Sequence, residues 1–140
     1  MKKVAIVFWS GTGNTEAMAE LIAQGVTAQG HIATIIPASV FKADYLNAFD
    51  AFALGCPATG DEALEPAEFL PLYEKIEPML LGRRVALFGS YGWNDGSWME
   101  LWKQRVSDAG ANVIGTAIAM GYPETDAAST CILLGRELVD

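Results

Sequence analysis

One short run of small and hydroxylated residues constrains the fold more than any other part of the chain. It reads Ser10-Gly11-Thr12-Gly13-Asn14-Thr15, and it lies between an apolar segment, residues 4–9, and a segment with helical spacing. A strand that ends in such residues at a helix start gathers backbone N–H groups and hydroxyls around an electropositive helix N-terminus. The run therefore predicts a phosphate-binding loop between a strand and a helix.

The loop lacks the residues that mark two common nucleotide-binding motifs. A nucleotide-hydrolase P-loop requires a Gly-Lys-Ser/Thr sequence, and no lysine occurs between Lys3 and Lys42. The dinucleotide fingerprint requires a third glycine, and Glu16 occupies that position. The loop thus suits a phosphate held by neutral donors, without a magnesium-bound triphosphate. The alternative is an ordinary strand-to-helix turn with a Ser/Thr cap.

Size and charge narrow the class of protein. A chain of 140 residues is predicted to form a single domain, residues 1–140. Its net charge of −8 argues against binding to nucleic acid and to anionic membrane surfaces. No apolar run approaches the ~20 residues of a membrane span, and we expect a cytoplasmic protein. Cys56 and Cys131 are far apart, so we expect two buried thiols and no metal site.

Apolar runs alternate with segments of helical spacing along the chain. Strands are predicted at residues 3–9, 32–37, 50–56, 84–90 and 112–120, and helices at 14–28, 66–80, 97–109 and 125–138. The segment 43–49 is compatible with a short helix or an irregular crossover. Continuously apolar strands indicate a parallel sheet covered by helices, which is a three-layer, doubly wound α/β domain. Ligands of such sheets bind at the carboxyl ends of the strands, where the strand order reverses.

The loops after the third and fourth predicted strands are the other unusual segments. They read Gly55-Cys56-Pro57-Ala58-Thr59-Gly60-Asp61-Glu62-Ala63-Leu64-Glu65 and Gly89-Ser90-Tyr91-Gly92-Trp93-Asn94-Asp95-Gly96-Ser97-Trp98. Trp93 lies between glycines, which have no side chains to shield it from solvent, so it is poorly placed for a core residue. Its flat face is suited to stacking on a planar ligand. Trp98 and Trp102 are four residues apart on a predicted helix, and we expect both in the core. For Trp9, lining the site and packing beneath it are equally compatible with the sequence.

With these three loops the chain resembles the short-chain flavodoxins over essentially its whole length. The motifs that carry the resemblance are residues 10–15, Ala58-Thr59-Gly60-Asp61-Glu62 and Ser90-Tyr91-Gly92-Trp93. The resemblance implies a five-stranded sheet of order 2-1-3-4-5 and one noncovalently bound FMN. It also implies a low-potential one-electron carrier that shuttles between the semiquinone and hydroquinone states and has no substrate of its own.

The same resemblance implies roles for individual residues around FMN. Ser10, Thr12, Asn14 and Thr15, with the amides around Gly11 and Gly13, would hold the phosphate. Trp93 would stack on the outer face of the ring, and Glu62 would accept a hydrogen bond from its N3–H group. The full expected set is Trp9, Ser10, Gly11, Thr12, Gly13, Asn14, Thr15, Pro57, Ala58, Thr59, Gly60, Asp61, Glu62, Ser90, Tyr91, Gly92, Trp93, Asn94, Asp95 and Gly96. The loop 120–123 is expected to border the site.

Two residues form the hypothesised redox switch. Rotation of the Gly60–Asp61 peptide would present the Gly60 carbonyl to N5–H of the reduced ring, and glycine permits the rotated conformation. Carboxylates in the loops after the third and fourth predicted strands (residues 55–65 and 89–98, here called the ring loops) would oppose the second electron and lower its potential. These carboxylates belong to Asp61, Glu62, Glu65 and Asp95. The chain departs from the short-chain pattern where Thr59 replaces a common methionine and Asn94 a common glycine.

Two rival functions follow from related folds. One is an FMN-dependent NAD(P)H:quinone-type reductase, although Trp93 would cover the ring face that such a substrate needs. The other is a phosphate-receiver signalling domain, which requires acidic residues where this chain has Trp9-Ser10 and Gly55-Cys56. A flavin-binding regulatory module would have the same sequence features as a carrier. For a carrier, the expected partners are redox proteins with basic docking surfaces, and the expected state is a monomer.

Overall fold

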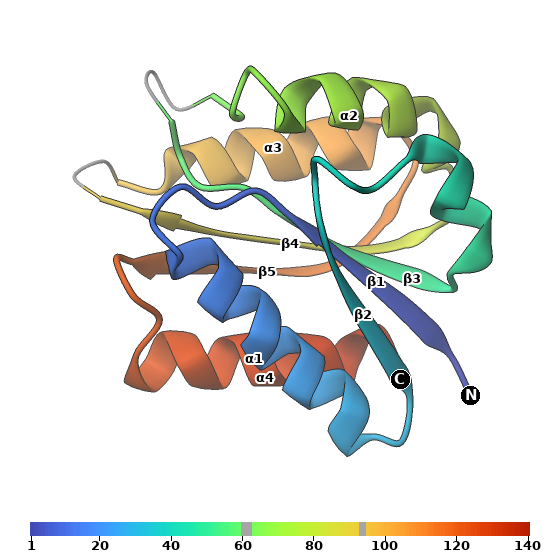
Figure 1. The fold of residues 1–140 in the computed structure, drawn as a ribbon, viewed down its shortest axis with the longest axis horizontal. Coiled ribbons are helices and arrows are strands. Elements are labelled where there is room, and N and C mark those ends of the chain that lie inside the picture. Colours follow the sequence, from blue (N-terminus) through green and yellow to red (C-terminus); the bar gives the residue numbers. More distant parts are fainter. Residues whose placement is uncertain (60–62, 93–94) are drawn as a thin grey trace.

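The computed structural model describes residues 1–59, 63–92 and 95–140 (Figure 1). These residues form the strands β1 (Lys3–Phe8), β2 (Ile32–Pro37), β3 (Ala51–Gly55), β4 (Arg84–Tyr91) and β5 (Asn112–Met120). The α-helices are α1 (Asn14–Ala28), α2 (Phe69–Ile76), α3 (Ser97–Asp108) and α4 (Thr125–Leu138). Two 3-10 helices, η1 (Ala43–Ala48) and η2 (Glu77–Met79), complete the described elements.

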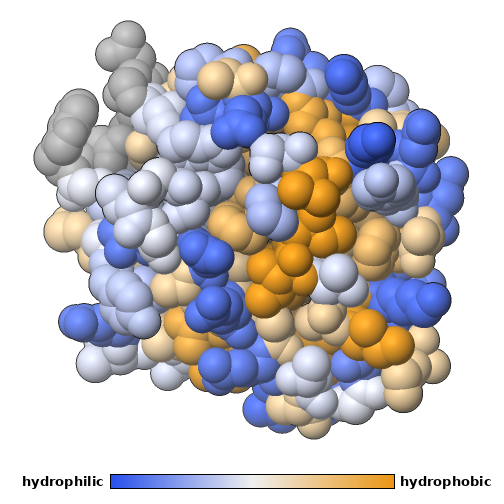
Figure 2. Space-filling model, in the orientation of Figure 1, coloured by the Kyte–Doolittle hydropathy of each residue, from blue (hydrophilic) through white to orange (hydrophobic). Residues whose placement is uncertain are grey.

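All five strands belong to one parallel sheet with the order β2-β1-β3-β4-β5. The three central strands are buried along nearly their whole length because helices cover both faces of the sheet. β2 forms an edge and is largely exposed. Figure 2 shows a stripe of hydrophobic side chains over β2, where Ile32 and Ile35 are 41% and 36% exposed.

One face of the sheet is covered by α1 and α4, which lie side by side (Figure 1). Met18, Ile22 and Val26 of α1 pack with Leu134 and Leu138 of α4 against the central strands. Two glycines let these helices approach closely. A Cβ atom added at Gly25 would collide with the Ile132 carbonyl oxygen, and one at Gly135 with the Ile22 carbonyl oxygen. Only glycine fits at either position without separating the helices.

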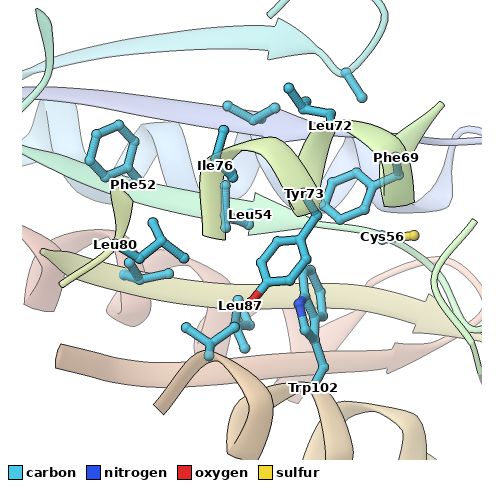
Figure 3. Close-up of a cluster of buried hydrophobic side chains, with 14 of the residues drawn as sticks. Phe52, Leu54, Cys56, Phe69, Leu72, Tyr73, Ile76, Leu80, Leu87 and Trp102 are labelled. Carbon is cyan, nitrogen blue, oxygen red and sulfur yellow. The ribbon is translucent and has the colours of Figure 1, made fainter. Parts of the chain in front are cut away.

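The opposite face is covered by α2 and α3, whose buried aromatic and aliphatic side chains pack together with those of the central strands (Figure 3). The ring of Trp102 meets the rings of Phe69 and Tyr73 edge to face, with centroids 5.5 and 6.1 Å apart. Trp98 and Trp102 are both buried, which confirms their predicted core position.

The predicted fold class and strand order are confirmed, and most of the predicted boundaries agree within two residues. The ambiguous segment is the 3-10 helix η1. The largest differences are at α2, predicted at residues 66–80 but observed at Phe69–Ile76, after which the chain continues as the 3-10 helix η2. Residues 66–68 form a turn instead. The N–H groups of Ala67, Glu68 and Phe69 donate to the carboxylate of Glu65, and Pro66 has no N–H group to donate. Among the described residues, no helix is long and apolar enough to cross a membrane.

Both cysteines are buried free thiols, as the sequence predicted. Burial raises the pKa of each thiol to about 12, so little reactive thiolate forms at neutral pH. We therefore expect a disulfide reagent such as Ellman's reagent to leave both thiols unmodified in the folded protein at pH 8. Both should react once urea unfolds the chain. Fast labelling of one thiol in the folded state would show that its side of the core opens readily.

Candidate functional site

Residues 10–15, the predicted phosphate loop, connect β1 to α1 at the carboxyl edge of the sheet, so their predicted place between a strand and a helix is confirmed. Gly13 is the N-cap of α1, and its φ of 97° is a left-handed conformation that favours glycine. The Oγ of Ser10 accepts a hydrogen bond from the Gly13 N–H at 3.0 Å. Within the described ranges, the backbone N–H groups of Gly11, Thr12, Asn14 and Thr15 donate no hydrogen bond. These N–H groups, at the start of α1, are available for an anion.

Three loops at this edge are joined by hydrogen bonds between their first residues. The Trp9 N–H donates to the Gly55 carbonyl at 3.0 Å, and the Ala58 N–H to the Ser90 carbonyl at 3.1 Å. The buried hydroxyls of Thr15 and Ser90 lie 3.1 Å apart, and the Ser90 N–H also donates to the Thr15 Oγ1. The phosphate loop and the two ring loops are thus held at fixed distances from one another.

A pocket of about 380 Å³ opens between these loops. Its described lining consists of Trp9, Gly11, Thr12, Asn14, Pro57, Ala58, Thr59, Ser90, Tyr91, Gly92 and Gly121. None of these side chains carries a charge, and no Lys or Arg occurs in residues 4–41, 43–74 or 85–102. The loop that follows β5 joins the site through the hydrogen bond from the Gly121 N–H to the Tyr91 carbonyl, at 2.9 Å. The pocket therefore offers hydroxyl, amide and aromatic groups to a ligand.

For Trp9 the sequence allowed two roles, lining the site and packing beneath it, and the structure shows features of both. Trp9 lines the pocket, and its ring lies against Gly11, where an added Cβ would be 3.2 Å from the ring atom Cη2. Its Nε1–H donates to the Oε1 of Glu68 at 3.1 Å. Trp9 thus contacts the phosphate loop and is held in place from the start of α2.

Most of the predicted site residues come together at this edge. Ser10 and Gly13 belong to the phosphate loop, and Thr15 is buried directly beneath it. Asp95 and Gly96 do not line the pocket but form the start of α3, where Asp95 Oδ1 accepts a hydrogen bond from the Ser97 N–H at 3.0 Å. The remaining predicted residues, Gly60, Asp61, Glu62, Trp93 and Asn94, lie outside the described residues.

Sequence reasoning missed the roles of two glutamates. Glu65 was counted among the carboxylates facing the ring, but its side chain is turned toward the backbone of α2. Glu68 was not singled out, although it orients Trp9. The available signal was the position of both carboxylates just before an apolar helix, where acidic side chains interact favourably with backbone N–H groups.

A larger surface hollow, of about 610 Å³, lies between η2 and α3. Its lining includes the ion pair between Arg105 Nε and Glu77 Oε2, 2.7 Å apart. Its described lining comes from η2 and α3 and includes no residue of the three loops that follow β1, β3 and β4. The pocket between the three loops is the better candidate because it combines phosphate donors with aromatic side chains.

Comparison with known proteins identifies the family. The flavodoxin family model matches residues 6–135. The chain is 48% identical to the flavodoxin of Megasphaera elsdenii, with 95% of this chain and 96% of the relative covered. The chain belongs to the flavodoxin family. It is also 44% identical to the flavodoxin of Clostridium beijerinckii, over 96% of this chain and 98% of that one.

A solved structure supports the same assignment. The solution structure of the two-electron reduced Megasphaera elsdenii flavodoxin superimposes with a TM-score of 0.90 at 47% identity and covers 96% of this chain and 97% of that one. The family consists of electron-transfer proteins that bind FMN, so the chain is an FMN-binding electron carrier that acts with redox partner proteins. The reductase alternative is not favoured.

The donor groups of the site fit FMN. Its phosphate is an anion that the unpaired N–H groups at the start of α1 can bind, and its flat ring suits a pocket with aromatic walls. When bound, FMN accepts and releases electrons one at a time. The protein contributes the positions of the donors around the phosphate and of the two ring loops.

Proposed function

We propose that this chain is a low-potential one-electron carrier consisting of one FMN-binding domain, residues 1–140. The observation that carries the proposal is the junction of three loops around one uncharged pocket, whose phosphate end is a helix start with unpaired N–H groups. Ser10, Thr12, Asn14 and Thr15 bind the phosphate, together with the amides around Gly11 and Gly13.

In the same proposal, residues 57–62 and 90–96 surround the ring. Pro57, Ala58, Thr59, Ser90, Tyr91 and Gly92 are supported by their place in the pocket or beside it. Trp93 stacks on the ring and Glu62 accepts the N3–H hydrogen bond, and both roles rest on the sequence motifs alone. Asp95 and Gly96 support the ring loop from the start of α3.

Charge supports the proposed partners and potential. Acidic side chains occur beside the three loops at Glu16, Glu68 and Asp95, while Lys and Arg are absent from the loops themselves. Such an edge favours redox partners with basic docking surfaces and disfavours a second electron on the ring. The net charge of −8 opposes self-association, which supports a monomer, and two free buried thiols are typical of the cytoplasm.

The proposed switch at Gly60 and Asp61 is tested with a Gly60→Ala variant. A Cβ atom restricts rotation of the Gly60–Asp61 peptide, and a carbonyl–N5–H hydrogen bond contributes about 1 kcal/mol. Stepwise reduction of the FMN-loaded variant should therefore show the two one-electron potentials closer together than in the unchanged protein. An equal separation in both proteins would remove Gly60 from the mechanism, and FMN affinity measured in parallel shows whether the cofactor is still held.

A further inference from the structure

The carboxylate of Glu65 is buried, and its partners among the described residues are all backbone N–H groups. Its Oε2 accepts a hydrogen bond from Ala67 at 2.7 Å, and its Oε1 accepts from Glu68 at 2.7 Å and from Phe69 at 3.0 Å. Glu65 is 6% exposed, and it forms no ion pair with any described residue. Burial acts to raise the pKa of this carboxyl, but the three backbone hydrogen bonds outweigh it and hold the pKa below its usual range. The side chain is thus an internal anion at the start of α2.

The backbone of Glu65 closes the base of the first ring loop. Its N–H donates to the Sγ of Cys56, the residue that follows β3, at 3.3 Å. Its carbonyl accepts a hydrogen bond from Leu70, in the first turn of α2, at 2.8 Å. Glu65 therefore connects the end of β3 to the beginning of α2.

A second connection lies above this base. Thr59 and Ala63 exchange two backbone hydrogen bonds of 3.2 and 3.0 Å, and the Thr59 Oγ1 donates to the Ala63 carbonyl at 2.8 Å. Residues 56–59 and 63–65 thus form a two-rung stem, with the contacts Cys56–Glu65 and Thr59–Ala63. In the sequence, residues 60–62 lie between the two halves of this stem, and they include Gly60 and Asp61 of the proposed redox switch.

We propose that Glu65 is a positioning residue for this switch. Its ionised carboxylate fixes the turn before α2, the fixed turn holds the Glu65 N–H against Cys56, and this contact keeps the stem closed. A closed stem fixes the positions of Thr59 and Ala63, the two described residues between which Gly60 and Asp61 occur in the sequence. The inference rests on the proposed function of Gly60 and Asp61, and it assigns the control of their geometry to a residue outside the pocket lining.

The test compares Glu65→Gln with Glu74→Gln, which removes the same charge from an exposed position of α2. In Glu65→Gln the amide nitrogen cannot accept a hydrogen bond, so the side chain loses at least one of its three backbone bonds. In the FMN-loaded protein, the amide protons of Thr59 and Ala63 should exchange with solvent at least about fivefold faster, as loss of about 1 kcal/mol of hydrogen bonding implies. The equilibrium constant relating the two one-electron steps should change by a similar factor, and Glu74→Gln should change neither quantity.

A purely structural role makes a different prediction. Glu65→Gln would then lower the melting temperature while amide exchange and the separation of the two potentials stay equal to those of Glu74→Gln, and this result would overturn the proposal. If Glu65→Gln does not fold, Glu65→Asp replaces it, because the shorter side chain keeps the charge but reaches fewer N–H groups. Gly60→Ala separates the two hypotheses. If Gly60→Ala changes the separation of the two one-electron potentials and Glu65→Gln does not, this inference alone is refuted. If Gly60→Ala leaves the separation unchanged, the switch is refuted and this inference with it.

Discussion

Replacing Thr12 by Asp is expected to weaken FMN binding roughly 30- to 1000-fold. Thr12 is exposed, lies one residue before the N-cap of α1 and lines the pocket beside the unpaired N–H groups. A carboxylate at this position would repel the phosphate, and two charges about 4 Å apart interact by roughly 1 kcal/mol in water and 4 kcal/mol near a protein surface. A loss of about 2–4 kcal/mol gives the expected range. Fluorescence titration of the FMN-free protein measures the dissociation constant directly.

Two controls make this result specific to the phosphate. Thr12→Asn is neutral and of similar size to the aspartate, so it should bind FMN within a few-fold of the unchanged protein. Riboflavin has the same ring without the phosphate, and Thr12→Asp should leave its affinity unchanged. Equal losses of affinity for FMN and riboflavin would show that the substitution disturbs the ring loops, and no loss for FMN would place the phosphate elsewhere.

Replacing Gly135 by Ala is expected to lower the free energy of unfolding by about 2 kcal/mol. The added Cβ would collide with the Ile22 carbonyl oxygen of α1, a backbone atom that cannot rotate away. Overpacking of a tight contact costs about 1–3 kcal/mol and more when the backbone must shift, whereas alanine gains about 1 kcal/mol over glycine in helix propensity. For a domain of this size, the melting temperature should fall by roughly 6–8 °C.

The matched control is Ser129→Ala, an exposed position on the same helix. It tests the general effect of alanine in α4, and it should change the free energy of unfolding by less than about 0.5 kcal/mol. Urea unfolding monitored by far-UV circular dichroism compares the three proteins. A Gly135→Ala protein as stable as the unchanged one would mean that α1 and α4 separate at little cost, contrary to their close approach.

The sequence predicted the sheet and its helices because their signals are local. Apolar runs such as Val4–Phe8 and Ala51–Cys56 define buried strands, and residues 10–15 mark a strand-to-helix junction without reference to any other segment. The strand order could not be obtained in this way. It depends on which runs pair in space, so it was predicted from the family resemblance and is confirmed by the structure.

The site was predicted less completely, because several of its contacts join distant segments. The Trp9–Glu68 hydrogen bond spans 59 positions and the Thr15–Ser90 contact spans 75, and neither follows from spacing. The turn at 66–68 was predicted as helix because its composition permits one. That the helix starts later follows from the direction of the Glu65 side chain, which the sequence does not show. The loop residues were predicted from their residue types, whereas the side chains that hold these loops in place could be found only in the three-dimensional structure.

Stepwise reduction of the purified, FMN-loaded protein tests the central claim most directly. With the absorption spectrum followed at a controlled potential, we expect one FMN per chain and two separate one-electron steps, the second at a clearly lower potential than the first. Reduction in a single two-electron step, or a protein that binds no FMN after careful reconstitution, would contradict the account.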